Sequence, residues 1–313
     1  MATMKQAQIT TWNTTPNYVE VPVPPTPANA PFVRVKVLAS GLHSLVRLRA
    51  TGTHYSATQL PHVPGSDGVG SLPDGSIVYF SAMMLPHGGA FTEYVDIPHI
   101  ACTKLPTGAD PVQVAGLVNP AAGSWMALAS LVAQLPTKFT VTILGVTSLS
   151  GTAAVSVAKL FGAGRVVGVA RSKDKMDAID GLDATVVLSD EGSTDWSAAL
   201  ETDVILDFLY GWPALCLLKA VKGVVHVQYM QIGSLAGPTI ALPGDLLRSK
   251  NITLRGSGPG AWTREQFAQQ APKIVAAVAQ GKIKPYPFRQ VKLEEVETVW
   301  EESAKTGERI VFL

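Results

Sequence analysis

The pattern of hydrophobic and polar residues changes along the chain near residue 115. Before this point, short runs such as Phe32 to Val37 alternate in the manner of strands, and Gly, Pro and Asp turns separate them. After it, apolar β-branched runs alternate with helical stretches long enough for crossover connections. Such runs are typical of parallel strands covered on both faces by helices. The pattern predicts a β-rich part followed by a doubly wound α/β part.

The order of the predicted elements indicates how these two parts are connected. Parallel strands are expected over 139–144, 165–170, 184–188, 203–206 and 224–229, and a helix over 151–161. Two further helices, 264–280 and 294–304, precede a final strand over 309–313. A terminal strand needs a sheet to join, and the β-rich part is the nearest candidate. We therefore predict a Rossmann-type domain, residues 116–258, inserted between the two parts of a catalytic domain, residues 1–115 and 259–313.

Composition excludes several classes of protein. The chain has 313 residues, 47% of them hydrophobic and 16% charged, which rules out intrinsic disorder. The net charge of +1 comes without a basic block, so nucleic acid is not an expected partner. The N-terminus lacks the apolar core of a signal peptide, and polar residues or prolines interrupt every long apolar run. We expect a cytoplasmic protein that does not span a membrane.

One segment has the pattern of a phosphate-binding turn. Gly145-Val-Thr-Ser-Leu-Ser-Gly151 follows the first predicted parallel strand and opens a helix, where free N–H groups and the helix dipole attract a pyrophosphate. Gly145 permits the tight turn and Gly151 lets the helix pack on the strand, while Ser148 replaces the usual middle glycine. An ordinary turn is the alternative interpretation. The candidate cofactor residues here are Gly145, Thr147, Ser148, Leu149, Ser150 and Gly151.

The end of the next strand indicates which dinucleotide is bound. An NAD-binding protein usually carries an acidic residue here for the ribose 2′-hydroxyl, whereas an arginine accommodates a 2′-phosphate. This chain carries basic residues and a hydroxyl instead, so NADPH is the favoured cofactor. Solvated charges at the start of a surface helix are the alternative. The candidate residues are Arg171, Ser172, Lys173 and Lys175.

Short motifs that occur in a fixed order along nearly the whole chain indicate a protein family. They include the segments 39–43, 52–55, 60–70, 73–79 and 89–94, Asn119-Pro120 and Gln231-Ile-Gly233. In order and spacing they resemble the medium-chain dehydrogenase/reductase superfamily, in its zinc-independent quinone oxidoreductase and enoyl reductase branch. The resemblance implies a GroES-like catalytic domain around the Rossmann-type domain, and a homodimer is typical of such proteins.

The cysteine content bears on the chemistry. Only Cys102 and Cys216 are present, so neither a disulfide framework nor the four-cysteine zinc site of related proteins can form, and a reducing compartment fits. The segment Gly65-Ser-Asp-Gly68 also lacks the histidine that is typical of a catalytic zinc site. We expect no metal, so the substrate should be a conjugated acceptor whose carbonyl needs only hydrogen-bond donors. The predicted function is NADPH-dependent reduction of a quinone or an α,β-unsaturated carbonyl compound.

Residues for catalysis and further cofactor contacts follow from the resemblance. Tyr55 resembles a tyrosine that orients or protonates the substrate oxygen in enoyl reductases, although packing at a cleft edge is the alternative. His43 stands where relatives carry a polar residue beside the nicotinamide, although a structural histidine bonded to the backbone is as reasonable. Asn119 is either a hinge residue near the cofactor or, as we favour, a helix cap before Pro120. The remaining expected cofactor contacts, at strand ends, are Ile232, Gly233 and Ser257.

Two alternative functions remain open at this point. A trans-acting enoyl reductase of a polyketide pathway would share these motifs and would act on carrier-bound thioesters, with a carrier protein or synthase as partner. A dinucleotide-binding protein without redox chemistry, such as a cyclase or a structural protein, would share the fold. In the favoured interpretation the partner is a small-molecule substrate.

Overall fold

The computed structural model describes residues 2–25, 31–57, 59–83, 85, 88–131, 134–223 and 226–313. The chain forms two compact units. Unit 1 comprises Met1–Asn119 and Thr263–Leu313, and unit 2 comprises Pro120–Trp262. The residues outside these ranges include part of the proline-rich segment 21–31, the residue His87, and the first two residues of the predicted strand 224–229.

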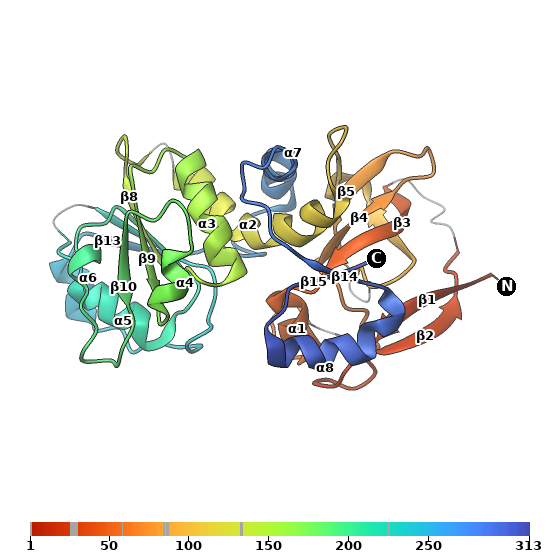
Figure 1. Cartoon of the computed structure of the whole chain (residues 1–313), viewed down its shortest axis with the longest axis horizontal. Helices are drawn as coiled ribbons and strands as arrows, with labels where there is room; N and C mark the ends of the chain where they lie inside the picture. Colours follow the sequence, from red (N-terminus) through yellow and green to blue (C-terminus); the bar gives the residue numbers. More distant parts are fainter. Residues whose placement is uncertain are drawn as a thin grey trace. The chain divides into compact units, whose positions relative to one another are not determined.

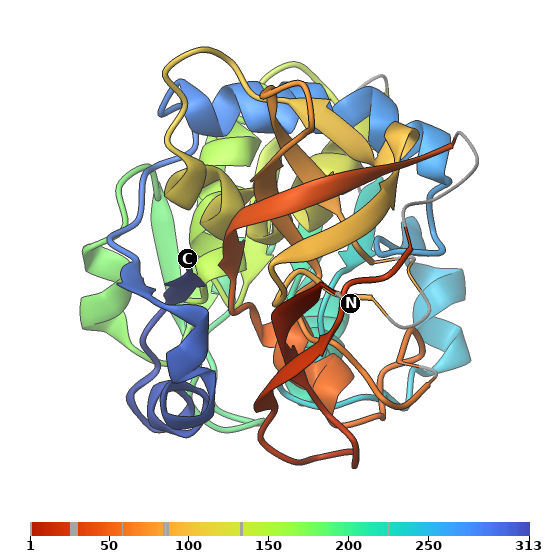
Figure 2. The same cartoon turned by 90° about the vertical axis from the view of Figure 1, so that its right-hand side faces the viewer.

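Most strands of unit 1 belong to one mixed parallel and antiparallel sheet (Figures 1 and 2). The strand order is β14-β15-β3-β4-β5-β7, β6 pairs with β3, and β1 and β2 form a separate antiparallel pair. The strands are β1 (Thr3–Gln8), β2 (Asn17–Pro22), β3 (Phe32–Gly41), β4 (Asp67–Ser71), β5 (Ile77–Ser81), β6 (Tyr94–Pro98), β7 (Cys102–Lys104), β14 (Arg289–Val291) and β15 (Ile310–Phe312).

The last strand of the chain joins the N-terminal sheet. Val311 of β15 pairs with Gly41 of β3, and the blue C-terminal segment lies beside the red and orange strands in Figures 1 and 2. This pairing gives the terminal strand the sheet that its apolar sequence requires. The helical elements of unit 1 are α1 (Ser44–Ala50), η1 (His99–Ala101), α7 (Arg264–Ala279), η4 (Leu293–Glu295) and α8 (Val296–Thr306).

Helix α8 closes the core of unit 1 with Val296, Val299 and Trp300, which are buried. Its contact with α1 is polar as well as apolar. The Arg47 guanidinium lies 4.7 Å from the Trp300 ring centroid and donates to the Trp300 carbonyl at 2.8 Å. Burial lowers the pKa of Arg47. The arginine therefore fixes the position of α1, the helix that follows His43.

Helix α2 (Pro111–Leu131) corrects one expectation from the sequence. Asn119 lies inside this helix rather than at its start, so it is not the cap that we favoured. Pro120 removes one intrahelical hydrogen bond, and the burial of the helix keeps it continuous through the proline. By length and composition α2 could cross a membrane, but 78% of its most apolar window is buried, as in a core helix.

Unit 2 is built on six parallel strands with the order β10-β9-β8-β11-β12-β13. The strands are β8 (Thr140–Leu144), β9 (Arg165–Ala170), β10 (Ala184–Val187), β11 (Val204–Asp207), β12 (Val227–Gln231) and β13 (Ile252–Gly256). The connecting helices are α3 (Leu149–Leu160), α4 (Lys173–Asp177), η3 (Ser197–Ala199), α5 (Gly211–Ala220) and α6 (Gly244–Ser249). This is the predicted doubly wound, Rossmann-type sheet.

The strand order of unit 2 determines where a ligand fits. From β8 the chain proceeds in one direction through β9 to β10, and from β11 it proceeds in the other direction to β13. The direction therefore reverses between β8 and β11, and open α/β sheets bind ligands at the carboxyl ends of the strands beside such a point. The turn at Gly145 and the carboxylate of Asp207 lie at these two strand ends.

Candidate functional site

The turn after β8 begins at Gly145. This glycine has φ +84°, a left-handed conformation that an L side chain rarely adopts. Its amide donates to the Val169 carbonyl at 2.9 Å, and the amide of Val146 donates to the same carbonyl at 3.2 Å. The turn is therefore tied to the neighbouring strand β9 before the chain enters α3.

Gly151 allows α3 to lie against this turn. A Cβ atom at Gly151 would lie 2.3 Å from the Gly145 carbonyl oxygen and 2.7 Å from the Cα atom of Val146. Both contacts are with backbone, which cannot rotate away. Close packing of helix on strand, the role predicted for Gly151, therefore requires a residue without a side chain at this position.

Ser148, which replaces the usual middle glycine of the turn, forms hydrogen bonds that a glycine could not form. It is the N-cap of α3, and its hydroxyl accepts the Gly151 amide at 3.0 Å and donates to the Gly145 carbonyl at 2.8 Å. Within the described part of the chain, no hydrogen bond engages the amides of Leu149 and Ser150. The first turn of α3 contains no acidic residue. Two free amides at an uncharged helix start fit a phosphate group.

The basic cluster lies at the end of β9, the strand next to β8. Ser172 caps α4, and Lys173 forms an ion pair with Asp177 within that helix. Arg171 is exposed, and its guanidinium has no ion pair or hydrogen bond to the residues that the structure describes. Lys175 is exposed as well. Of the predicted set, Arg171 and Lys175 therefore keep their charge available at the edge of the sheet where the Gly145 turn lies.

Sequence reasoning missed Asp207, which ends β11 and is fully buried. Its Oδ1 accepts the amides of Leu209 at 2.7 Å and Tyr210 at 2.9 Å, and its Oδ2 accepts the Tyr229 hydroxyl. Burial raises the pKa of Asp207, and burial together with this carboxylate raises the pKa of Tyr229. The position of Asp207 at the end of a predicted strand was the signal that could have identified it. Its partner Tyr229 lies on another strand, and no sequence motif connects the two residues.

Asp207 also shapes the neighbouring strand end. Its carbonyl accepts the amides of Ile232 at 2.8 Å and Gly233 at 3.0 Å, so these two predicted cofactor contacts have their N–H groups occupied. Ser257 is buried, and its hydroxyl donates to the Gly123 carbonyl at 2.9 Å. The backbone carbonyl of Ile232 and the lone pairs of the Ser257 hydroxyl are the groups that these residues can still offer to a ligand.

The two predicted catalytic residues lie in unit 1, before and after α1. His43 is the residue before this helix, and its imidazole is buried with Nε2 3.4 Å from Oδ1 of Asp67. Tyr55 is 67% exposed, and its ring centroid lies 4.2 Å from that of His54. Desolvation raises the pKa of Tyr55, so the phenol is protonated at neutral pH and can donate a hydrogen bond.

A second buried imidazole gives the stability of unit 1 a dependence on pH. His62 is 2% exposed, and burial, with the charge of Arg49 in second place, lowers its pKa from 6.5 to about 4. The native state therefore binds this proton less well than the unfolded state. The resulting stabilisation is complete above pH 6.5 and is lost as the pH falls toward 4.

We expect the His62→Gln variant to lose this dependence. Between pH 7.5 and pH 5 the free energy of unfolding of the wild type should fall by about 2 kcal/mol more than that of the variant. Urea unfolding at the two pH values measures the difference. His99→Gln, at an exposed histidine, is the control and should behave as the wild type. Equal pH dependence in His62→Gln and the wild type would contradict a buried neutral His62.

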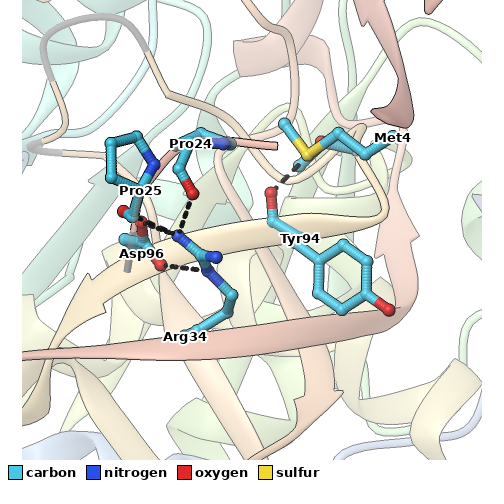
Figure 3. Close-up of polar contacts among 7 residues, drawn as sticks. Met4, Pro24, Pro25, Arg34, Tyr94 and Asp96 are labelled. Carbon is cyan, nitrogen blue, oxygen red and sulfur yellow. Dashed lines mark hydrogen bonds and ion pairs between the residues drawn. The ribbon is translucent and has the colours of Figure 1, made fainter. Parts of the chain in front are cut away.

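A groove of about 420 Å³ in unit 1 is lined by none of the predicted site residues. Figure 3 shows the contacts of Arg34, one of the residues that line it. Arg34 lies in it, but the guanidinium forms two hydrogen bonds with Asp96, at 2.9 and 2.8 Å, and donates to the carbonyls of Pro24 and Pro25. Its charge is thus already neutralised within the protein. Among the described residues, no group of three or more His, Cys, Asp and Glu side chains could hold a metal ion.

Comparison with known proteins agrees with this architecture. No protein-family model matches the chain. It is 33% identical over 361 aligned residues to tdiC of Emericella nidulans, a probable NADPH-dependent quinone reductase, covering 99% of this chain and 100% of that protein. It is 25% identical over 286 residues to a quinone oxidoreductase-like protein 2 homolog of Nematostella vectensis, covering 84% of this chain and 76% of that protein.

Solved structures share the whole fold. A mycobacterial quinone oxidoreductase matches with a TM-score of 0.83 at 17% identity, covering 99% of both chains. An NADPH:quinone reductase from Bacillus thuringiensis, described as putative, matches with a TM-score of 0.82 at 14% identity, covering 100% of this chain and 99% of that chain.

A parallel sheet with a glycine turn at its switch point, together with a separate β-rich unit, defines the medium-chain dehydrogenase/reductase class of fold. Within that class, the chain belongs to the quinone oxidoreductase family. The family that the sequence motifs resembled is therefore confirmed.

Proposed function

We propose that this protein is a cytoplasmic, NADPH-dependent reductase of quinones or other α,β-unsaturated carbonyl compounds. The observation that carries the proposal is the turn of unit 2, where the amides of Leu149 and Ser150 and the side chain of Arg171 are free at the carboxyl edge of the sheet. The relative tdiC is a probable NADPH-dependent quinone reductase, which supports the same cofactor and substrate class here.

The residues of unit 2 would hold the cofactor. The two free amides of α3 would bind the pyrophosphate, and Arg171 with Lys175 would bind the 2′-phosphate through charge-assisted hydrogen bonds. Ile232 and Ser257 would offer acceptors at the ends of β12 and β13. When bound, the nicotinamide supplies the hydride with both electrons for the reduction.

The residues of unit 1 would act on the substrate oxygen. Adding a hydride to a quinone or an enone leaves negative charge on that oxygen, and a hydrogen-bond donor lowers the cost of forming it. Tyr55 carries a protonated phenol, and His43 carries an imidazole that can deliver a proton. Both roles are part of the proposal.

Calorimetric titration with NADPH, followed by NADPH oxidation assays, tests this function. We expect binding and consumption of NADPH with a panel of quinones and enones. Activity confined to enoyl thioesters would instead favour the carrier-dependent enoyl reductase. Binding without consumption by any acceptor would favour a non-redox protein, and absence of binding at millimolar NADPH would reject the proposal.

The choice of NADPH over NADH has its own test in Arg171→Ala. Loss of one charge-assisted hydrogen bond to the 2′-phosphate should raise the KM for NADPH about tenfold and leave the KM for NADH unchanged. Arg248→Ala is a matched control, because Arg248 is exposed on α6, just before the amino end of β13 at the opposite edge of the sheet. Equal increases for both dinucleotides in Arg171→Ala would contradict the assignment.

A further inference from the structure

The side chain of Asp67 is a buried carboxyl group whose oxygens are unpartnered in the described part of the chain. Asp67 is 0% exposed, and neither of its side-chain oxygens has a hydrogen-bond partner among the described residues. Burying an isolated carboxylate is strongly unfavourable, so a fold that retains one usually pairs it with a cation or a strong donor. The basic side chain that lies within 4 Å of this carboxyl group is the imidazole of His43, with Nε2 3.4 Å from Oδ1.

The backbone of unit 1 fixes the positions of these two side chains. The Ser40 hydroxyl at the end of β3 donates to the Asp67 carbonyl at 2.7 Å, which ties β3 to the start of β4. The imidazole of His43 packs on Gly41, where a Cβ atom would lie 2.4 Å from Cε1 and 2.5 Å from Nε2. The ring is therefore confined between Gly41 and the carboxylate, with Nε2 directed to Asp67.

The other polar groups described around the carboxylate are hydroxyls, which carry no positive charge. Tyr79 of β5 lies diagonally across from Asp67, because Val69 pairs with Tyr79 and Asp67 with Ser81. Burial, followed by the charge of Asp67 and a polar interaction of the phenol with its carboxylate, raises the pKa of Tyr79 well above its ordinary value, so the phenol stays a neutral donor. The neighbouring hydroxyl of Ser66 is buried without a partner. Among the residues that the structure describes, His43 is the basic side chain within 4 Å of this carboxyl group.

We propose that Asp67 is the positioning residue for His43. Its carboxylate accepts the Nε2–H of the imidazole, which fixes the tautomer and leaves Nδ1 as the nitrogen that exchanges a proton with the substrate oxygen. The separation of 3.4 Å is longer than a hydrogen bond, as is common for catalytic pairs before the substrate binds.

The inference rests on the proposed reduction, and its proton balance is simple. The hydride brings both electrons to the acceptor and leaves one negative charge on it. The imidazolium then releases its Nδ1 proton to the acceptor oxygen, the neutral ring keeps its Nε2–H on Asp67, and solvent returns one proton to Nδ1. One acceptor, one hydride and one proton give the reduced, neutral product.

The tautomer of His43 can be read directly in the wild-type protein. In protein labelled with ¹⁵N-histidine, long-range ¹H–¹⁵N spectra should show the Nε2–H tautomer for neutral His43, identified by the signal that His43→Gln lacks. Asp67→Leu keeps a branched side chain without acceptors and should give a mixture of tautomers. Asp67→Asn keeps one acceptor oxygen and should retain the Nε2–H form.

Kinetics of the same variants provide the second readout. Asp67→Leu should lower kcat with a quinone or enone about tenfold while the KM for NADPH stays unchanged, and Asp67→Asn should retain more of the activity. Ser66→Ala, beside Asp67 and equally buried, is the control and should match the wild type in both experiments.

The outcomes separate this inference from the proposed function. A wild-type His43 in the Nδ1–H form, or a spectrum unchanged by Asp67→Leu, would overturn the role of Asp67 even in an active reductase. A wild type that reduces no acceptor would overturn the proposed function, and the spectra would still decide whether Asp67 fixes the imidazole. The wild-type spectrum decides this point even where Asp67→Leu does not fold.

Discussion

Replacing Asp207 by alanine is expected to lower the free energy of unfolding of unit 2 by about 4 kcal/mol, because one buried and two partly buried donors lose one shared acceptor. These donors are the amides of Leu209 and Tyr210 and the hydroxyl of Tyr229. Tyr210 has φ +54°, an unfavourable conformation for a side chain that these hydrogen bonds help to hold. Urea unfolding followed by circular dichroism measures the loss.

The same variant should weaken cofactor binding, because the Asp207 side chain ties the end of β11 to Tyr229 of β12 and holds the turn at Leu209 and Tyr210. Tyr229→Phe removes one of the three donors and should cost about 1–2 kcal/mol. Asp190→Asn, at an exposed aspartate of the same unit, is the control and should change stability by less than about 0.5 kcal/mol. A similar small change in Asp207→Ala would show that the carboxylate does not organise this strand end.

Gly151→Ala should give the second large effect, on both stability and NADPH binding. The added methyl would lie 2.3 Å from the Gly145 carbonyl oxygen, so α3 must move away from the turn. We expect a loss of about 3 kcal/mol in the free energy of unfolding and about a 100-fold loss of affinity for NADPH, as the free amides leave their positions. Thermal unfolding and calorimetric titration measure the two quantities.

The control for this substitution is Gly192→Ala. Gly192 is exposed in unit 2, and no atom lies within 4 Å of the position that its Cβ would take. The control should bind NADPH as the wild type does. If Gly151→Ala also bound NADPH normally, the phosphate would not be held at the start of α3, and the proposed cofactor site would have to be abandoned.

The strands and helices of unit 2 could be predicted because short stretches of sequence determine them. Strand β9, Arg165–Ala170, coincides with the predicted range, and α3 begins two residues before the expected helix, at Leu149. β-branched runs and the Gly145 and Gly151 pair determine these elements within a few residues of chain. The wrong expectation for Asn119 came from treating Pro120 as a helix start, whereas packing keeps the helix continuous through it.

The role of Ser148 shows where local reasoning stops. The sequence presents a small residue in place of a glycine, and both a spacer and a helix cap are compatible with that identity. Only the folded turn brings its hydroxyl to the Gly151 amide and the Gly145 carbonyl. The resulting cap occupies one amide of α3 and leaves those of Leu149 and Ser150 for a ligand.

By itself the sequence determined the family, the order of strands and helices, and the positions of the glycine turn and its basic neighbours, because each is encoded in short motifs that are local in the chain. The tertiary structure alone decided which polar groups are already occupied and which are free. Asp207 meets Tyr229, and His43 meets Asp67, because sheet pairing joins segments more than twenty residues apart. Such contacts depend on strand register and burial, which no single segment of sequence contains.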